Sequence, residues 1–336
     1  MADFHLVPGF EDVWRLPVRP RHVRPQSVLG RADMTPRARL ERVARRAPEV
    51  MVKVTGRTRD GAHLRAHLEY ISRNGGLMLE DQDGLELRGR EEVRETAMDW
   101  SALAELDAGR RSNSPMSVSI ILSMPRETDP ISLRDAARDF ARDSFGGRFD
   151  FVTALHTDTD HPHVHLSVRA LGYGGERLNP RKADLTAWRQ RFAEALRDRG
   201  VEAEATPRRA RGVVRKPERM AVRRLGERHE RGQGPVSRVR RAGYIEAARE
   251  AASSAPRPRP WEDVIVERQR QTRGLYLAQA AVLARSADPD DRALSVLVRE
   301  FVSRMPQMEF RRTMLLRELG VAPERTPPPS GRARTR

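Results

Sequence analysis

Regular patterns of apolar residues concentrate between residues 47 and 212. Alternating or continuous apolar positions predict four strands, at 50–56, 116–124, 148–156 and 163–172. Apolar residues at helical spacing predict four helices, at 62–73, 90–106, 131–145 and 183–199. Strands mixed with helices, several of them adjacent in an antiparallel-compatible way, predict an α+β domain with a central antiparallel sheet flanked by helices.

The flanking regions have a different pattern. Residues 1–46 are rich in Arg and Pro and poor in apolar periodicity, which predicts a disordered basic tail. Residues 213–260 are expected to form a basic linker region and residues 261–320 a mostly helical region. Residues 321–336 are expected to form a second disordered basic tail.

Composition narrows the chemistry. The 336 residues include 63 Lys and Arg against 47 Asp and Glu, a formal charge of +16. This excess favours a polyanionic partner, because neutralised phosphates release condensed counterions. With no Cys in the chain, disulfides and thiolate metal sites are excluded, and a metal must bind His, Asp or Glu. No apolar run approaches the roughly 20 residues of a membrane span, and the N-terminus does not resemble a signal peptide, so we expect a cytoplasmic protein.

Four of the nine histidines lie within HTDTDHPHVH, residues 156–165. His163 and His165 alternate on a predicted strand and therefore share one face. A hairpin across the intervening turn would bring His156 beside His163, so these three imidazoles are the predicted metal ligands. His161 is the alternative third ligand, because it lies two residues before His163 and would share the strand face of His163 and His165. The neighbouring Asp158 is suited to accept the free N–H of a ligating imidazole.

Among the four tyrosines, Tyr70 has the most distinctive context. It lies near the C-terminal end of the predicted 62–73 helix, next to its apolar stripe, and its alternative role is an ordinary residue at the rim of the core. The basic residues expected around it are Lys53, Arg57, Arg59, Arg65 and Arg73. Because a phenol has a pKa near 10, it needs a base, a cation or a metal nearby before it attacks phosphorus.

Two segments together resemble conjugative relaxases of the HUH superfamily. They are VKVTGRTRDGAHLRAHLEYISRNGGLMLE and FVTALHTDTDHPHVHLSVRA, and the branch they most resemble is that of the T-DNA border endonucleases. The resemblance implies that Tyr70 is the nucleophile, that His156, His163 and His165 bind Mg²⁺ or Mn²⁺, and that Ser123 approaches the DNA. It also gives Asp158 a role in orienting a histidine and assisting Tyr70. His63 and His67, on the tyrosine helix, depart from the family pattern.

The implied activity is that of a site- and strand-specific relaxase. Such an enzyme nicks single-stranded DNA at a transfer origin, forms a 5′-phosphotyrosyl adduct and rejoins the strand. Lys53, Arg57 and Arg73 are the expected contacts to DNA. The alternatives are a rolling-circle replication initiator, a metal-dependent nuclease that uses water, and a basic non-catalytic DNA-binding accessory protein. The implied partners are relaxosome accessory proteins and a type IV secretion coupling protein, with export alongside the DNA and an export signal in the C-terminal tail.

Overall fold

The computed structural model describes residues 4–14, 35–214, 218–253 and 259–320. The chain divides into two compact units. Unit 1 holds the described residues up to Pro207 except Val7–Trp14, and unit 2 holds Val7–Trp14 together with the described residues from Arg208 onward.

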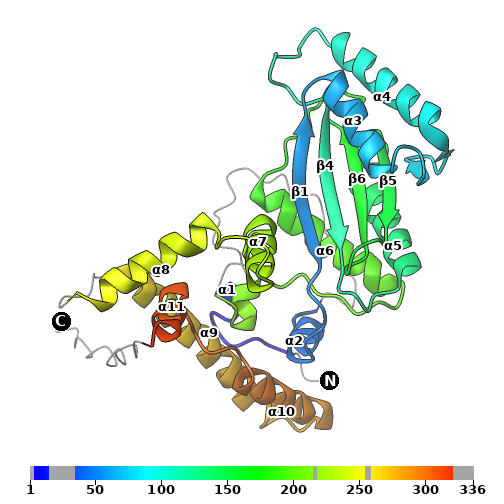
Figure 1. Cartoon of the computed structure of the whole chain (residues 1–336). Coiled ribbons are helices and arrows are strands. Elements are labelled where there is room, and N and C mark those ends of the chain that lie inside the picture. The colour runs from blue at the N-terminus through cyan, green and yellow to red at the C-terminus, as the bar shows by residue number, and fades with distance from the viewer. Residues whose placement is uncertain (1–3, 15–34, 215–217, 254–258, 321–336) are drawn as a thin grey trace. The chain divides into compact units, whose positions relative to one another are not determined.

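Unit 1 is built on a six-stranded sheet in the order β1-β4-β6-β5-β2-β3 (Figure 1). Every neighbouring pair is antiparallel, which agrees with the expected sheet. The strands are β1 (Met51–Thr58), β2 (Leu79–Asp81), β3 (Glu86–Leu87), β4 (Ser117–Ser123), β5 (Phe151–His156) and β6 (His163–Arg169). The four longer strands correspond to the four predicted ones, whereas the short β2–β3 hairpin was not predicted.

Helices cover both faces of this sheet. They are α3 (Gly61–Ile71), α4 (Gly89–Glu105), α5 (Pro130–Phe145) and α6 (Lys182–Asp198), while α2 (Pro36–Ala44) precedes β1 in the chain. On one face, Ile120 of β4 and Leu166 of β6 belong to one core with Phe140 of α5 and Phe192 of α6. A second core joins α3 and α4 to β2, β3 and part of β5 on the other face. The central strands are therefore fixed from both sides, which holds the side chains at their ends in place.

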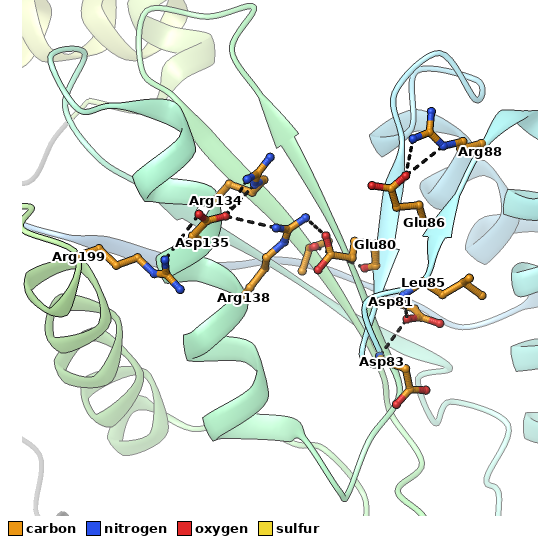
Figure 2. Close-up of polar contacts among 11 residues, drawn as sticks. Glu80, Asp81, Asp83, Leu85, Glu86, Arg88, Arg134, Asp135, Arg138 and Arg199 are labelled. Atoms are coloured by element: carbon orange, nitrogen blue, oxygen red, sulfur yellow. Dashed lines mark hydrogen bonds and ion pairs between the residues drawn. The ribbon is translucent and has the colours of Figure 1, made fainter.

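An ion-pair network attaches the β2–β3 hairpin to α5 (Figure 2). Arg138 of α5 pairs with the buried Glu80 of β2 and also contacts Asp135, with 3.3 Å between Nη1 and Oδ1. Arg199, which follows α6, lies 3.6 Å from the same Asp135 carboxylate. Burial lowers the pKa of Arg138, with the nearby Arg142 and Arg199 acting in the same direction. The short strands are therefore held by a long-range charge contact as well as by the buried Leu79 and Leu87 of the second core.

Unit 2 is helical. It contains α1 (Glu11–Trp14), a 3₁₀ turn (Arg208–Arg211), α7 (Met220–Glu230), α8 (Arg238–Ala251), α9 (Pro260–Leu283), α10 (Pro289–Ser303) and α11 (Arg311–Glu318). Tyr276 of α9 is fully buried, and its ring lies 4.9 Å from Phe10 and 5.2 Å from Phe301 between centroids. Across the described part of the chain, every helix is too short or too polar to span a bilayer.

The N-terminal region differs from the disordered tail expected for residues 1–46. Phe10 is fully buried and packs edge-on against Trp14, so the few large apolar residues there form a local core. Further along, Thr35 caps α2 through the Ala38 amide, and Leu40 of that helix is fully buried. The expectation was based on the average composition, which hides these two short apolar clusters. Residues 15–34 lie outside the described residues.

The expected boundaries in the second half also need adjustment. The domain expected over 47–212 ends close to the end of unit 1 at Pro207. The region 213–260, expected as a basic linker, contains the helices α7 and α8, and Ala247 of α8 is buried with Leu315 and Leu316 of α11. The helical region expected over 261–320 agrees with α9, α10 and α11. The expected basic tail over 321–336 lies outside the described residues.

Candidate active site and metal centre

Three histidines meet at one end of the β5–β6 hairpin. His156, the last residue of β5, pairs in register with His163, the first residue of β6, and His165 lies two residues further along β6. The alternation of a strand puts His163 and His165 on one face, as the sequence predicts. The ring centroids are 5.2 Å (His156–His163), 4.4 Å (His156–His165) and 5.0 Å (His163–His165) apart. One ligand atom from each lies within 4.8 Å of the others.

Backbone carbonyls orient two of these rings. Nε2 of His156 donates to the carbonyl of Ile71 at 2.7 Å, which leaves the lone pair on Nδ1. Nδ1 of His163 donates to the carbonyl of His161 at 3.1 Å, which leaves the lone pair on Nε2. Such outer hydrogen bonds are how proteins fix the tautomer of a metal-binding imidazole. The sequence pointed to Asp158 for this task, but main-chain oxygens perform it.

Burial favours the neutral form of His165 and His156. It lowers the pKa of His165 to about 3, and repulsion from His156, His163, His67 and Arg73 adds to the effect. Burial is also the main reason that the pKa of His156 is lowered, with Arg73 and His163 contributing. Neutral imidazoles are the form that binds metals. Three such donors on one side of a site fit a divalent metal ion, while His161 contributes only its carbonyl and its exposed side chain is outside the group.

Tyr70 lies beside this cluster. It occupies the last turn of α3, and its ring meets the His165 ring edge-on at 6.0 Å between centroids. The side chain is 56% exposed, so its hydroxyl is accessible, while Leu64, Leu68 and Ile71 of the same helix are fully buried. The structure therefore places the predicted tyrosine next to the predicted histidines, although they are 95 residues apart in the sequence (70 to 165).

The chain reverses direction directly after α3. Arg73 and Asn74 adopt left-handed backbone conformations with φ of 53° and 56°, followed by Gly75 at 85°. A Cβ on Gly75 would come within 2.4 Å of the Arg90 amide nitrogen, so only glycine fits there. The reversal returns the Arg73 guanidinium towards Tyr70, and its Cζ lies 5.5 Å from the centroid of the tyrosine ring.

Arg73 connects three parts of the site. Its Nη2 lies 3.2 Å from Nδ1 of His156, and it forms an ion pair with Asp158 in the β5–β6 turn. Since the His156 Nε2–H already faces a carbonyl, Nδ1 accepts this hydrogen bond from the arginine, and a metal ion bound at Nδ1 would replace the arginine there. Asp158 thus holds Arg73, whereas the sequence led us to expect it against a histidine or Tyr70. Arg73 was predicted as a DNA contact and as one of several basic residues around Tyr70, but no sequence signal indicated its contacts with His156 and Asp158.

The remaining predicted DNA contacts divide into two groups. Lys53 and Arg57 are exposed on β1, the edge strand of the sheet, as a DNA-binding role requires. Ser123 ends β4 opposite His163, as expected, but it is only 5% exposed. Its hydroxyl donates to the Pro162 carbonyl at 3.2 Å. Ser123 therefore supports the turn that leads into His163, and a direct contact with DNA does not fit its burial.

The other tyrosines have less accessible or less reactive hydroxyls. Tyr173 donates to Asp150 at 2.5 Å, and burial followed by this carboxylate raises its pKa to about 12. Tyr244 donates to Glu318 at 2.5 Å, which raises its pKa. Tyr276 is fully buried. Tyr70 is the tyrosine that the structure places at the histidine cluster.

The two unexpected histidines on α3 have distinct environments. Nε2 of His67 lies 2.9 Å from the Ser119 hydroxyl of β4, and burial lowers the pKa of His67. This contact joins the tyrosine helix to the sheet one turn before Tyr70. His63 is exposed and contacts the helix-capping Asp60 at 2.5 Å. The position of His67 three residues before Tyr70 was the available signal, but it did not reveal the partner.

The chain is similar to known proteins over about half of its length. Residues 70–201 match the family model "Relaxase: MobA/VirD2-like, nuclease domain". The chain is 30% identical over 198 residues to the T-DNA border endonuclease VirD2 of Rhizobium radiobacter, covering 54% of this chain and 47% of that protein. It is 29% identical over 203 residues to VirD2 of Agrobacterium fabrum, covering 55% and 45%. The chain thus spans about half the length of the curated relatives it matches.

A solved structure aligns over a similar share of the chain. It is a MobM relaxase domain bound to oriT DNA, with 13% identity and a TM-score of 0.38. The alignment covers 52% of this chain and 98% of the other. The expected resemblance to relaxases of the T-DNA border endonuclease branch is confirmed by the family match and by the curated relatives.

Proposed function

We propose that residues 70–201, which match the MobA/VirD2-like relaxase nuclease domain model, act as a relaxase nuclease domain, and that the chain nicks one DNA strand at a transfer origin through Tyr70. The observation that carries this proposal is the exposed Tyr70 ring beside His165 of the His156–His163–His165 cluster. An accessible phenol next to neutral imidazoles suits attack on a phosphodiester that a metal ion also contacts. The nick initiates transfer of a conjugative plasmid or another mobile element.

The reaction is a transesterification. The phenolic oxygen of Tyr70 forms a bond to phosphorus, and the bond from phosphorus to the 3′ oxygen breaks. The phenolic proton is lost and the 3′ oxygen gains one, giving a free 3′ hydroxyl and a 5′-phosphotyrosyl adduct. Because one phosphodiester replaces another, the step is reversible and the strand can be rejoined. A Mg²⁺ or Mn²⁺ ion held by the three histidines would supply Lewis-acid stabilisation of the charge on the phosphate oxygens.

Arg73 supplies a fixed positive charge at the same place. Its guanidinium lies over the Tyr70 ring and against His156, so it attracts the incoming phosphate. The ion pair with Asp158 prevents the long side chain from leaving this position. We therefore assign Asp158 a positioning role through Arg73, in place of direct assistance to Tyr70.

Tyr70→Phe tests the nucleophile. The variant should bind single-stranded DNA as the native chain does but form no covalent adduct, because phenylalanine lacks the attacking oxygen. The measurement is denaturing gel electrophoresis of labelled single-stranded DNA carrying the transfer origin of the encoding element, with Mg²⁺ or Mn²⁺. Tyr173→Phe is the matched control and should retain the adduct, since its hydroxyl is already bound to Asp150.

Each alternative gives a different gel. Cleavage without an adduct would indicate a nuclease that uses water. Binding without cleavage would indicate a non-catalytic accessory protein. An adduct formed only at a replication origin, with no effect on mobilisation, would indicate a rolling-circle initiator.

We also propose the cellular setting that accompanies this activity. The chain would act in the cytoplasm on single-stranded DNA with relaxosome accessory proteins, and a type IV secretion coupling protein would receive it for export. The basic residues 321–336 are the proposed export signal. Deleting residues 322–336 should leave nicking in vitro intact and lower transfer to recipient cells in a mating assay. Transfer at the native frequency would reject this signal.

A further inference from the structure

Unit 1 contains a second polar site at the opposite end of the sheet from the histidines. A cavity of about 600 Å³ opens there, which is within the size range of pockets that take small ligands. Three segments line it: the end of β1, the 109–115 loop before β4, and the chain just after β6. The lining residues are Arg57, Gly109, Arg111, Asn113, Ser114, Pro115, Ala170, Arg177, Leu178 and Asn179.

The lining has the chemistry of an anion site. It includes three arginines and no acidic residue. Arg177 pairs with Asp107 outside the lining, whereas the guanidinium groups of Arg57 and Arg111 have no carboxylate partner within the described ranges. Planar guanidinium groups bind phosphate oxygens in pairs, so two unpaired arginines at one cavity form a suitable phosphate clamp. The amides of Asn113 and Asn179 offer both donors and acceptors next to it.

Internal contacts give the 109–115 loop a defined shape. The Gly109 amide donates to Asp107 at 3.0 Å, and the Arg111 amide donates to the Ser114 hydroxyl at 3.2 Å. The guanidinium of Arg110 donates to the Arg59 carbonyl at 2.6 Å, which ties the loop to the chain after β1. The Arg111 backbone is thereby fixed while its side chain remains exposed.

The geometry of the sheet sets the distance to the nicking site. Ser123 of β4 pairs with His163 at one end, and Ser117 pairs with Arg169 at the other, next to the cavity. Six residue steps at ~3.4 Å each separate these ends by about 20 Å. The edge strand β1 spans the same interval and exposes Lys53 and Arg57 along it. A basic edge therefore runs from the histidine end of the sheet to the cavity.

From these observations we propose that the cavity binds a nucleotide of the substrate strand remote from the nick. Arg57 and Arg111 hold its phosphodiester, and Asn113 and Asn179 contact its base. The site rests on the proposed function for its ligand and adds an anchor to it. The two ends of the sheet are about 20 Å apart, and a stacked strand advances ~3.4 Å per nucleotide. The bound nucleotide is therefore at most about six nucleotides from the scissile phosphate, and fewer if the strand is extended. The anchor fixes the register of the strand over Tyr70.

The salt dependence of binding tests the clamp. The probe is a fluorescent 30-nucleotide oligothymidylate, measured by anisotropy across a series of NaCl concentrations. The plot of log K against log[NaCl] should be less steep by ~0.7 in Arg57→Ala/Arg111→Ala, because the two arginines neutralise one phosphate and each neutralised single-strand phosphate contributes about 0.7. Arg142→Ala removes an exposed arginine from α5 and should leave the slope unchanged. An unchanged slope in the double variant would refute the clamp.

A second measurement locates the strand. Because the chain has no cysteine, Asn113→Cys introduces a unique thiol at the cavity, and Glu95→Cys on the exposed side of α4 is the matched control. Saturating oligothymidylate should slow maleimide alkylation several-fold at position 113 and leave it unchanged at position 95. Equal rates with and without DNA at position 113 would place the strand elsewhere.

The two proposals fail separately. The clamp is measured by reversible binding of oligothymidylate, which does not involve cleavage. The proposed function is measured by the covalent adduct. A native chain that forms the adduct but shows no change of slope in the variants rejects only the anchor. A chain that forms no adduct while the slope changes as expected rejects only the nicking function.

Discussion

Acidification should destabilise unit 1, because His165 and His156 are buried in their neutral form and protonation favours the unfolded chain. The same burial suits these histidines for metal binding. The perturbation is a change from pH 7 to pH 5 in the presence of a chelator. His165 has a pKa of about 3 in the folded chain against 6.5 as a free side chain. Between these values the unfolded state binds a proton that the folded state does not, so stability rises with pH and falls on acidification. The lowered pKa values of His156 and His67 act in the same direction.

The magnitude follows from the two pKa values of His165. At pH 7 both states are mostly neutral, and the contribution of this residue is close to its maximum. At pH 5 the unfolded side chain is protonated, and the gap of about 1.5 pH units below 6.5 corresponds to a loss of about 2 kcal/mol. The folded side chain remains neutral at this pH and compensates for none of the loss. A domain with an ordinary stability of ~5–15 kcal/mol would show this clearly.

Urea denaturation at several pH values, followed by circular dichroism, measures the effect. His165→Gln removes the titrating group. Between pH 7 and pH 5 the free energy of unfolding of this variant should therefore fall by about 2 kcal/mol less than that of the native chain. His161→Gln removes an exposed histidine outside the cluster and should follow the native curve. If His165→Gln and the native chain lose the same stability on acidification, then His165 is not buried in the neutral form, and the geometry of the site is wrong.

Three further predictions concern single side chains. Glu80→Gln removes the more buried of the two carboxylates that contact Arg138 and should lower the free energy of unfolding by about 3 kcal/mol, measured by urea denaturation; an unchanged midpoint would contradict the ion pair. His163→Ala should abolish Mn²⁺ binding in isothermal titration calorimetry while His161→Ala retains it, and the reverse result would make His161 the ligand. Arg73→Gln should slow adduct formation roughly a hundredfold at saturating DNA, and a native rate would exclude its electrostatic role.

The helices and strands of unit 1 could be predicted where their buried residues recur at a regular spacing in the sequence. Leu64, Leu68 and Ile71 at helical spacing predicted α3, and all three are fully buried. The alternation of His163 and His165 with buried Val164 and Leu166 predicted β6 and the face that carries the histidines. The antiparallel pairing of His156 with His163 followed from the short turn between the strands.

Elements too short to show a regular spacing of apolar residues were not predicted. The strands β2 and β3 contain three and two residues, too few for a periodic signal, and the buried Glu80–Arg138 pair joins positions 58 residues apart (80 to 138). The helix α1 spans four residues, and its aromatic neighbours pack on Tyr276, more than 260 positions away. Contacts between distant segments decide these elements, and no local pattern encodes them.

The partners of polar side chains were the least predictable part of the site. The sequence drew attention to Asp158 and Ser123 but did not indicate what they bind. Asp158 pairs with Arg73, and the Ser123 hydroxyl donates to the Pro162 carbonyl. The position of Arg73 depends on left-handed residues after α3, which a sequence pattern suggests only as the end of a helix. Spacing therefore predicts which residues converge, and the backbone path decides what they touch.

The charges of the site explain why its histidines must be neutral. The Arg73–Asp158 pair has no net charge, and burial removes the charge from His156 and His165. A divalent ion would bring two positive charges, which the phosphodiester and the Tyr70 phenolate would balance with one negative charge each. Protonated imidazoles would repel the ion and give up the lone pairs that bind it. The burial that destabilises unit 1 in acid is thus the same property that makes the cluster suitable for a metal and a phosphate.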